Sequence, residues 1–412
     1  MGRLMGQSDH AGGLRRWQTP LLVVVAGLCI ATIGMGTRSV FGLFLPPMTE
    51  ARGWSREAFA FAMAMQNLTV GLLMPVAAST ADRFGPIRVI AGGACLYAFG
   101  IWLMTVIEIP LVFQLVGGVL VGAGLSFTSF SIAIAAMVRV VDPARRTMVM
   151  GLAMSAGSFG MVLFSPIAQG FITAFGWNHA LMLLALISLG MIPLVLCLPG
   201  DPNLSAEQTA QTGVREAIRE AFRHRGYLLL TTGFFVCGFH VSFITVHLPV
   251  YTLDLGFAAR VGAVCLSLIG LFNIAGSLLA GLAGTHFSRK LSLSVIYTGR
   301  AILITTFLLL PKSEPLLYIF ASVMGLLWLA TVPLTTDIVA RVFGVRYLAT
   351  LYSFVFLSHQ VGGFVGVWLG GVIYEATGSY DGMWLAGIAV GLLAALVHLP
   401  INERPLPRLA VT

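Results

Sequence analysis

The sequence predicts an all-α membrane protein in which twelve transmembrane helices form two pseudo-symmetric six-helix bundles. The prediction rests on an apolar composition, on twelve apolar segments of spanning length and on an internal repeat. Of the 412 residues, 58% are hydrophobic and only 10% are charged, whereas soluble domains carry about 25% charged residues. We therefore expect the lipid bilayer to surround most of the chain.

Each predicted span contains a run of about 20 predominantly apolar residues, the length that crosses the hydrocarbon core as a helix. The first six spans lie near residues 20–46, 57–80, 88–107, 111–137, 148–174 and 180–199. The second six lie near residues 227–251, 260–283, 291–311, 315–339, 347–374 and 382–400. The first segment is too long for a signal-peptide core, and no small-residue cleavage site follows it, so we read it as a span.

A polar linker is expected between the two sets of spans, at 200–226, with one short amphipathic helix at 214–223. The remaining chain divides into an N-terminal tail at 1–19, a first half at 20–199, a second half at 227–400 and a C-terminal tail at 401–412. Eighteen of the 24 Lys and Arg residues fall on the side of the two tails, and four fall on the opposite side. The positive-inside rule therefore predicts that both termini are cytoplasmic, in the cell inner membrane.

The internal repeat is visible in three pairs of similar segments, and the two members of each pair are separated by nearly the same number of residues. The pairs are 78–87 with 281–290, 139–152 with 340–353, and 172–186 with 374–388, at offsets of 203, 201 and 202 residues. Chance does not explain three pairs at nearly one offset, so the chain is read as two copies of a six-span unit. Parallel halves of this kind, with a site near the midplane between them, are one plan of secondary transporters.

The loop "ADRFGPIRVI" resembles the motif that major facilitator superfamily transporters carry between spans two and three. Asp82, Arg83 and Gly85 stand in the expected places. Asp82 can pair across a neighbouring helix end while Arg83 and Arg88 anchor to the membrane surface, so these four residues are predicted to latch one conformation. The alternative is an ordinary positively charged turn.

Further segments are similar to the monocarboxylate and oxalate/formate branch of that superfamily. They are "RSVFGLFLPPMTEARGWSREAFAFA", "RRTMVMGLAMSAGSFGMVLFSPI", "FGWNHA" and "GGVIYEATGSYDGMW". Gly118 stands where proton-driven drug exporters keep an arginine, which argues against a drug/proton antiporter. The resemblance implies secondary transport of a small organic anion.

Arg38, deep in the first span, is the predicted anchor for the substrate anion. A guanidinium presents a fork of donors that matches a carboxylate, and the monocarboxylate carriers are expected to hold a basic residue at this place. The alternative is an arginine whose side chain extends to the membrane interface.

The other predicted substrate-binding residues are polar side chains inside spans, where polar groups are costly and usually functional. His240 and His247 share one face of span seven and could carry a coupling proton, although each could instead be bonded to neighbouring backbone. The remaining candidates are Gln66, Asn67, Asn273, His359 and Gln360. The amides of Gln66, Asn67 and Asn273 could equally form interhelical hydrogen bonds. The resemblance implies a basic residue in span eleven, so His359 could be a weaker version of it.

Arg300 in span nine is predicted to form a structural ion pair with Asp337 in span ten. No Asp or Glu lies in the middle of a span, and span eight lacks the charged pair typical of monocarboxylate carriers. Any coupling proton would therefore require a histidine or would travel on the substrate.

The sequence contains no nucleotide-binding loop, no metal-ligand cluster and no nucleophile–base pattern, so neither an enzyme nor a cofactor is expected. The net charge of +8 comes without a basic run, which argues against nucleic acid binding. The five cysteines lie in apolar segments and are read as small buried hydrophobic residues. The predicted function is transport of an organic anion by a monomer; the alternatives are a carrier of neutral or aromatic solutes and a non-transporting membrane sensor.

Overall fold

The computed structural model describes residues 18–142, 145–200, 213–344 and 346–406, and these residues form helices without any strand. Eleven helical segments are long and apolar enough to cross a membrane. One of them, Met148–Val195, has 48 residues, which corresponds to about 72 Å of helix and so to more than twice the thickness of a hydrocarbon core, about 30 Å. Gly176, with φ of +77°, interrupts it. The segment therefore contains two spans, and the predicted total of twelve is confirmed.

The first half contains several short helices because three of its spans are interrupted. Its elements are α1 (Pro20–Ser39), η1 (Phe41–Phe44), α2 (Leu45–Arg52), α3 (Arg56–Phe84), α4 (Pro86–Val106), α5 (Pro110–Gln114), η2 (Leu115–Leu120), α6 (Val121–Phe127), α7 (Phe130–Arg139), α8 (Arg146–Leu189) and α9 (Met191–Val195). Span one is formed by α1, η1 and α2, and span four by α5, η2, α6 and α7.

The second half has longer helices and one interrupted span. Its elements are α11 (Arg225–Asp254), α12 (Ala259–His286), α13 (Arg289–Leu309), α14 (Glu314–Leu327), α15 (Thr331–Phe343), α16 (Leu348–Thr377) and α17 (Asp381–His398). The amphipathic helix predicted between the halves is confirmed as α10 (Val214–Arg223). Residues 201–212 of the predicted linker, 1–17 of the predicted N-terminal tail and 407–412 of the predicted C-terminal tail lie outside the described residues.

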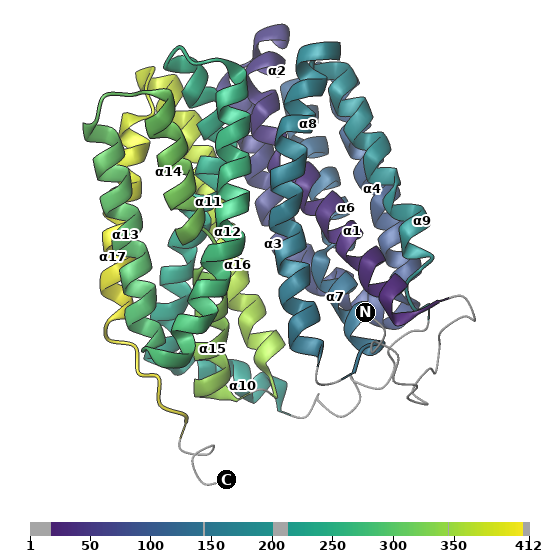
Figure 1. The fold of residues 1–412 in the computed structure, drawn as a ribbon, viewed down its shortest axis with the longest axis vertical. Helices are drawn as coiled ribbons and strands as arrows, with labels where there is room; N and C mark the ends of the chain where they lie inside the picture. Colours follow the sequence, from purple (N-terminus) through teal and green to yellow (C-terminus); the bar gives the residue numbers. More distant parts are fainter. Residues whose placement is uncertain (1–17, 143–144, 201–212, 345, 407–412) are drawn as a thin grey trace.

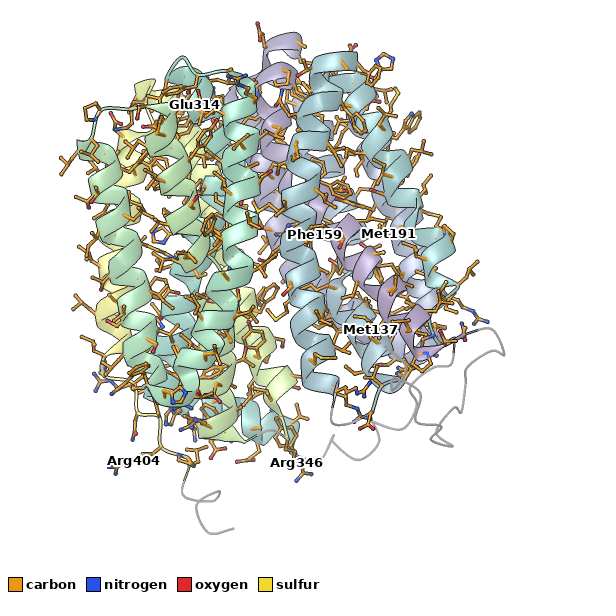
Figure 2. The ribbon with its side chains drawn as sticks, viewed as in Figure 1. Met137, Phe159, Met191, Glu314, Arg346 and Arg404 are labelled. Atoms are coloured by element: carbon orange, nitrogen blue, oxygen red, sulfur yellow. The ribbon has the colours of Figure 1, made fainter. Side chains whose placement is uncertain are left out.

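The two halves lie side by side, with the first half drawn in purple to blue and the second in green to yellow (Figure 1). Helix α1 begins and α17 ends at the same end of the molecule, which we name the terminal end. Arg346 and Arg404 lie at this end, whereas Glu314 lies at the opposite end, which we name the far end (Figure 2).

The surface of the helices is apolar where lipid would contact it. Val295 on α13 is 70% exposed and Leu309 at the end of the same helix is 80% exposed. Large apolar side chains with this exposure are costly in water, and they are the expected outer surface of a membrane-spanning bundle.

The repeat seen in the sequence reappears in how the helices cross. Gly160 on α8 and Gly362 on α16 are 202 residues apart, and each faces a backbone carbonyl of its partner helix. A Cβ on Gly160 would lie 2.4 Å from the carbonyl oxygen of Thr32 on α1, and one on Gly362 would lie 1.9 Å from that of Phe235 on α11. The two halves therefore use the same close crossing, which only glycine permits.

Candidate functional site

Arg38 lies in the last turn of α1, about midway along span one, and its side chain is only partly exposed. Its Nη2 donates a hydrogen bond of 2.6 Å to Oδ1 of Asn67 on α3. A guanidinium has five N–H donors, and this is the one hydrogen bond that Arg38 makes with described residues through its side chain. Among the same residues no carboxylate forms an ion pair with it, so the charge of Arg38 has no acidic partner there.

Asn67 connects this arginine to the second half of the chain. Nδ2 of Asn67 donates to the carbonyl of Met63 at 3.0 Å, within α3. Its backbone carbonyl accepts a hydrogen bond of 3.1 Å from Nε2 of Gln360 on α16. Both amide side chains are buried, so this contact joins the two halves in the interior of the molecule.

His359 continues the same series of contacts. Its Nδ1 lies 3.1 Å from Oε1 of Gln360, and because an amide oxygen only accepts, Nδ1 is the protonated nitrogen. The imidazole stacks on Phe356 with a centroid distance of 5.7 Å and lies 5.0 Å from the ring of Phe234. We name Arg38, Asn67, Gln360 and His359 the central polar chain; the structure brings these four predicted residues together.

The two histidines of span seven lie elsewhere. Nε2 of His240 lies 2.8 Å from the carbonyl of Gly387 on α17. His247 lies 3.0 Å from the Tyr380 hydroxyl and 2.9 Å from the carbonyl of Val367. Burial raises the pKa of the Tyr380 phenol well above its usual range, so the hydroxyl keeps its proton. Both histidines face the interior of the second half, and their contacts match the alternative of backbone-bonded histidines.

Gln66 and Asn273 also form interhelical hydrogen bonds. Nε2 of Gln66 donates to the carbonyl of Gly117 at 3.1 Å inside the first half. Nδ2 of Asn273 donates to Oγ of Ser158 at 2.8 Å, and its Oδ1 accepts from the backbone N–H of Leu329 at 2.9 Å. Asn273 therefore joins the halves and supports the break between α14 and α15, and its contacts do not include the central polar chain.

The sequence profile of the Major Facilitator Superfamily matches residues 27–311 and 263–411. The chain belongs to the major facilitator superfamily. It is 24% identical over 394 residues to the uncharacterized MFS-type transporter YcxA of Bacillus subtilis (strain 168), covering 91% of this chain and 94% of that protein. The predicted membership in this superfamily of transporters is thereby confirmed.

The predicted resemblance to the monocarboxylate and oxalate/formate branch is also confirmed, at low identity. The chain is 25% identical over 401 residues to monocarboxylate transporter 11 of Homo sapiens, covering 94% of this chain and 83% of that protein. It is 24% identical over 373 residues to the oxalate:formate antiporter of Oxalobacter formigenes, covering 89% and 87%. The fold is similar to that of a bacterial homologue of the human lysosomal transporter Spinster, with a TM-score of 0.75, 11% identity and coverage of 98% and 100%.

The superfamily loop motif lies at the terminal end of this transporter. Gly85, with φ of +85°, ends α3 and allows the sharp turn into α4. Asp82 lies 3.9 Å from Arg139 at the end of α7, while Arg83 and Arg88 are exposed. The structure thus pairs Asp82 within its own half, and the proposed latching role of the motif remains a prediction.

The predicted ion pair between Arg300 and Asp337 is wrong. Asp337 pairs with Arg289 at 2.6 Å, near the terminal end. Arg300 is fully buried and donates to the carbonyl of Leu327, at 2.6 Å from Nη2, and to that of Trp328. Helix α14 ends there, and its last carbonyls have no helical donor, so the cation binds the negative end of the helix dipole.

Replacing Arg300 with methionine is expected to lower the free energy of unfolding by about 2–4 kcal/mol, because two buried carbonyls lose a charged donor. The measurement is the melting temperature of the purified protein in detergent. The matched control is Arg289→Met, which breaks an ion pair whose carboxylate partner, Asp337, is 42% exposed, and it should change stability by at most about 1 kcal/mol. Equal melting temperatures for Arg300→Met and the unaltered chain would contradict the capping role.

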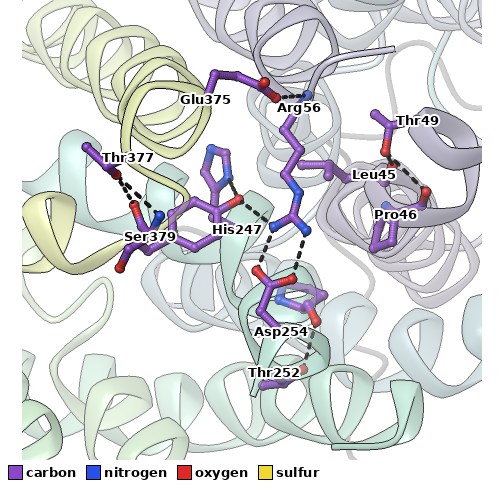
Figure 3. Close-up of polar contacts among 12 residues, drawn as sticks. Leu45, Pro46, Thr49, Arg56, His247, Thr252, Asp254, Glu375, Thr377 and Ser379 are labelled. Carbon is purple, nitrogen blue, oxygen red and sulfur yellow. Dashed lines mark hydrogen bonds and ion pairs between the residues drawn. The ribbon is translucent and has the colours of Figure 1, made fainter. Parts of the chain in front are cut away.

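A charged contact at the far end was not predicted from the sequence. Both terminal nitrogens of Arg56 on α3 bind the carboxylate of Asp254 on α11, at 2.6 and 2.7 Å (Figure 3). The backbone N–H of Arg56 donates to Glu375 at 2.7 Å, and its guanidinium lies 3.8 Å from the ring centroid of Tyr374. The sequence places these residues on one side of the membrane, but it contains no signal that they are paired.

The hydrogen bonds between the halves are unevenly distributed along the spans. Those that join two described residues, besides the bonds of Arg56, are Gln360 to Asn67, Asn273 to Ser158 and Ser267 to Val162. All of them lie at the far end or near the middle of their helices. Within the described ranges, no such bond joins the halves near the terminal end, so the halves are fastened at the far end.

Replacing Arg56 with alanine is expected to favour states in which the far end is open. A bidentate pair of this exposure contributes about 1 kcal/mol, which is about a fivefold change in population. Double electron–electron resonance between spin labels at His179 and Arg260, both exposed at the far end, would show a growing long-distance component. Asp337→Asn breaks an ion pair within one half and should leave the distances unchanged. Identical distances in Arg56→Ala and the unaltered chain would contradict the fastening role.

Proposed function

We propose that this transporter moves a small organic anion, of the monocarboxylate class, across the inner membrane by alternating access, and that it catalyses no chemical reaction. The observation that carries the proposal is Arg38. It is a cation midway along a span, it touches the junction of the two halves, and no described acid neutralises it. The monocarboxylate and oxalate/formate relatives support the same class of substrate.

The chemistry of Arg38 suits a carboxylate. An unpaired charge inside a membrane is costly, and a bound anion would offset that cost. Asn67 holds one Nη2 donor and so orients the guanidinium, leaving other N–H groups for the two oxygens of a carboxylate. Gln360, from the second half, donates a hydrogen bond to the backbone carbonyl of Asn67. A ligand bound at Arg38 would therefore lie next to residues of both halves.

The positive-inside rule supports a cytoplasmic location for the terminal end, where Arg346 and Arg404 lie. With the far end fastened by Arg56 and Asp254, the described conformation corresponds to the stage that is closed toward the outside. Transport then requires the halves to rock, so that the far-end contacts break while contacts form at the terminal end.

Uptake of radiolabelled acids into proteoliposomes tests the proposal. The panel pairs each small monocarboxylate with its primary amide, which has nearly the same shape and no charge. We expect saturable uptake of at least one acid, and no uptake of its amide. Uptake of amides and not of acids would overturn the anion assignment, and empty liposomes control for diffusion of the protonated acid.

A carrier of neutral or aromatic solutes is the second candidate. It is favoured by the uncharged amides of Asn67 and Gln360 and by the stacked rings of Phe356 and His359. A ligand that binds the folded state raises its apparent stability. Thermal-shift measurements with neutral heterocycles and with carboxylates therefore separate the two candidates by which set raises the melting temperature.

A further inference from the structure

Helix α10, between the two halves, carries a row of three arginines on one face. Arg215, Arg219 and Arg223 are four residues apart, so they lie on successive turns of the same side of the helix. All three are exposed, and none forms an ion pair with a described residue. Like charges four residues apart on a helix repel each other. The row therefore has an electrostatic cost, which an anionic partner would remove.

The opposite face of α10 packs on the second half. Ala221 is 0% exposed and Ala217 is 5% exposed. The ring of Phe222 lies 5.6 Å from that of Tyr227 on α11 and 5.5 Å from that of Phe354 on α16. A helix of 10 residues is marginally stable by itself in water, so these contacts hold α10 in place. They also fix the direction of the arginine row, which faces away from the buried alanines.

Two further arginines adjoin the row. Arg225 begins α11, two residues after Arg223. Arg346 precedes α16, and its guanidinium lies 5.2 Å from the ring centroid of Tyr347. The hydroxyl of Tyr347 reaches the start of α10, because a Cβ on Gly213 would lie 2.6 Å from it. Both arginines are exposed, and neither pairs with an acid in the described ranges. We name the five residues Arg215, Arg219, Arg223, Arg225 and Arg346 the linker basic patch.

Two acids adjoin the linker basic patch and neutralise it only in part. Glu216 and Glu220 are the acidic residues of α10, so five arginines against two glutamates leave an excess of three positive charges. Arg289, by contrast, lies at the same end of the molecule and is paired with Asp337 at 2.6 Å. The linker basic patch therefore has charge available for a partner outside the chain.

The position of α10 brings this patch to the surface of the bilayer. Helix α10 lies at the terminal end (Figure 1) and is followed directly by α11, which is a span. Phe222 on α10 and Leu228 in the first turn of α11 are each 44% exposed. A row of arginines with exposed apolar side chains next to it is typical of a helix that lies in the interface between lipid and water.

We propose that the linker basic patch binds the headgroups of anionic phospholipids in the cytoplasmic leaflet. Guanidinium groups bind phosphate oxygens through paired, charge-assisted hydrogen bonds. Clusters of about four to eight basic residues on an amphipathic helix are typical of binding to anionic lipids. The proposal rests on the cytoplasmic location of the terminal end, which is part of the proposed function, and not on the identity of the substrate.

Bound lipid restrains the two helices that fasten the far end. Helix α10 contacts both α11 and α16 at the terminal end. At the far end, α11 provides Asp254 and α16 provides Glu375, and both residues bind Arg56. Attachment of α10 to the membrane surface therefore fixes the terminal ends of the same two helices.

Thermal-shift measurements on the purified full-length protein in an uncharged detergent test the binding. The probe is dihexanoyl phosphatidylglycerol, which is anionic, and the comparisons are dihexanoyl phosphatidylcholine, which has no net charge, and inorganic phosphate. We expect only phosphatidylglycerol to raise the melting temperature, and the rise to shrink with added salt. No rise with phosphatidylglycerol would overturn the proposal. An equal rise with inorganic phosphate would also overturn it, because the site would then bind free anions.

The variant Arg215→Gln/Arg219→Gln/Arg223→Gln removes the arginine row and keeps the buried face of α10. Each arginine near an anionic surface raises affinity about fivefold, so the apparent affinity for phosphatidylglycerol should fall by roughly 100-fold. The melting temperature without lipid should not fall, since the three side chains are exposed.

The matched control is Arg145→Gln/Arg146→Gln/Arg404→Gln, which removes three exposed arginines elsewhere at the terminal end. It has the same net charge as the α10 variant and should keep the response to phosphatidylglycerol. An equal loss of response in both variants would overturn the site, because it would show that overall charge attracts the lipid.

Photocrosslinking locates the lipid on the unaltered chain and so does not depend on how the variants fold. In vesicles that contain phosphatidylglycerol with a photoreactive group, peptides from residues 214–228 should be labelled. Labelling confined to other peptides would overturn the proposal. None of these measurements uses a transported substrate. If the chain takes up no carboxylate, the anion carrier is wrong, and the thermal shifts and crosslinks still decide the lipid site.

Discussion

Replacing Arg38 with glutamine is expected to lower carboxylate uptake at low substrate concentration by roughly 30-fold or more. The variant loses the charged donor of a desolvated carboxylate, a loss of about 2–5 kcal/mol. Glutamine keeps an N–H donor for Asn67, so the contact between α1 and α3 can persist. The measurement is initial-rate uptake in proteoliposomes, corrected for the amount of reconstituted protein.

Two further variants serve as comparisons for Arg38→Gln. Arg38→Lys keeps the charge but not the bidentate fork, so intermediate uptake is expected. Arg260→Gln removes an exposed arginine at the far end and should leave uptake unchanged. Undiminished uptake by Arg38→Gln, with a normal melting temperature, would show that the anion binds elsewhere.

Replacing Gly238 with alanine is expected to prevent stable folding of the second half. The new Cβ would lie 1.7 Å from the carbonyl oxygen of His359, so α11 and α16 would have to separate. Overpacking against side chains costs about 1–3 kcal/mol, and backbone atoms cannot rotate away, so the loss here should exceed that range. The measurement is the melting temperature in detergent, together with the yield of monodisperse protein.

Gly281 on α12 provides the control, because a Cβ there meets no atom within 4 Å. Alanine at this position should be neutral, or should stabilise the helix by up to about 1 kcal/mol. If Gly238→Ala and Gly281→Ala had the same melting temperature, α11 and α16 would have to cross at a greater separation than the contact at Gly238 indicates.

The fold could be predicted because hydropathy and repetition are recorded directly in the sequence. Span boundaries follow from the length of apolar runs, and the interruption at Gly176 fell between two predicted spans. The same offset of about 202 residues separates Gly160 from Gly362. Only the tertiary structure shows that both glycines lie at close helix crossings.

The candidate site was predictable only as a set of polar residues in apolar spans. Arg38, Asn67 and Gln360 carry that signal and meet at the junction of the halves. His240 and His247 are also polar residues in an apolar span. The orientation of α11, however, directs both side chains toward backbone carbonyls of the second half. Periodicity shows which residues share a helix face, and it does not show what that face meets.

By itself, the sequence determined the membrane environment, the two six-span halves and the short set of polar residues among which a site must lie. The tertiary structure alone decided the partners. Arg300 binds the carbonyls at the end of α14 instead of Asp337, and Arg56 binds Asp254 across 198 residues of chain. Spans are fixed by the local transfer of side chains into lipid, whereas partners depend on how helices distant in sequence rotate and pack against each other.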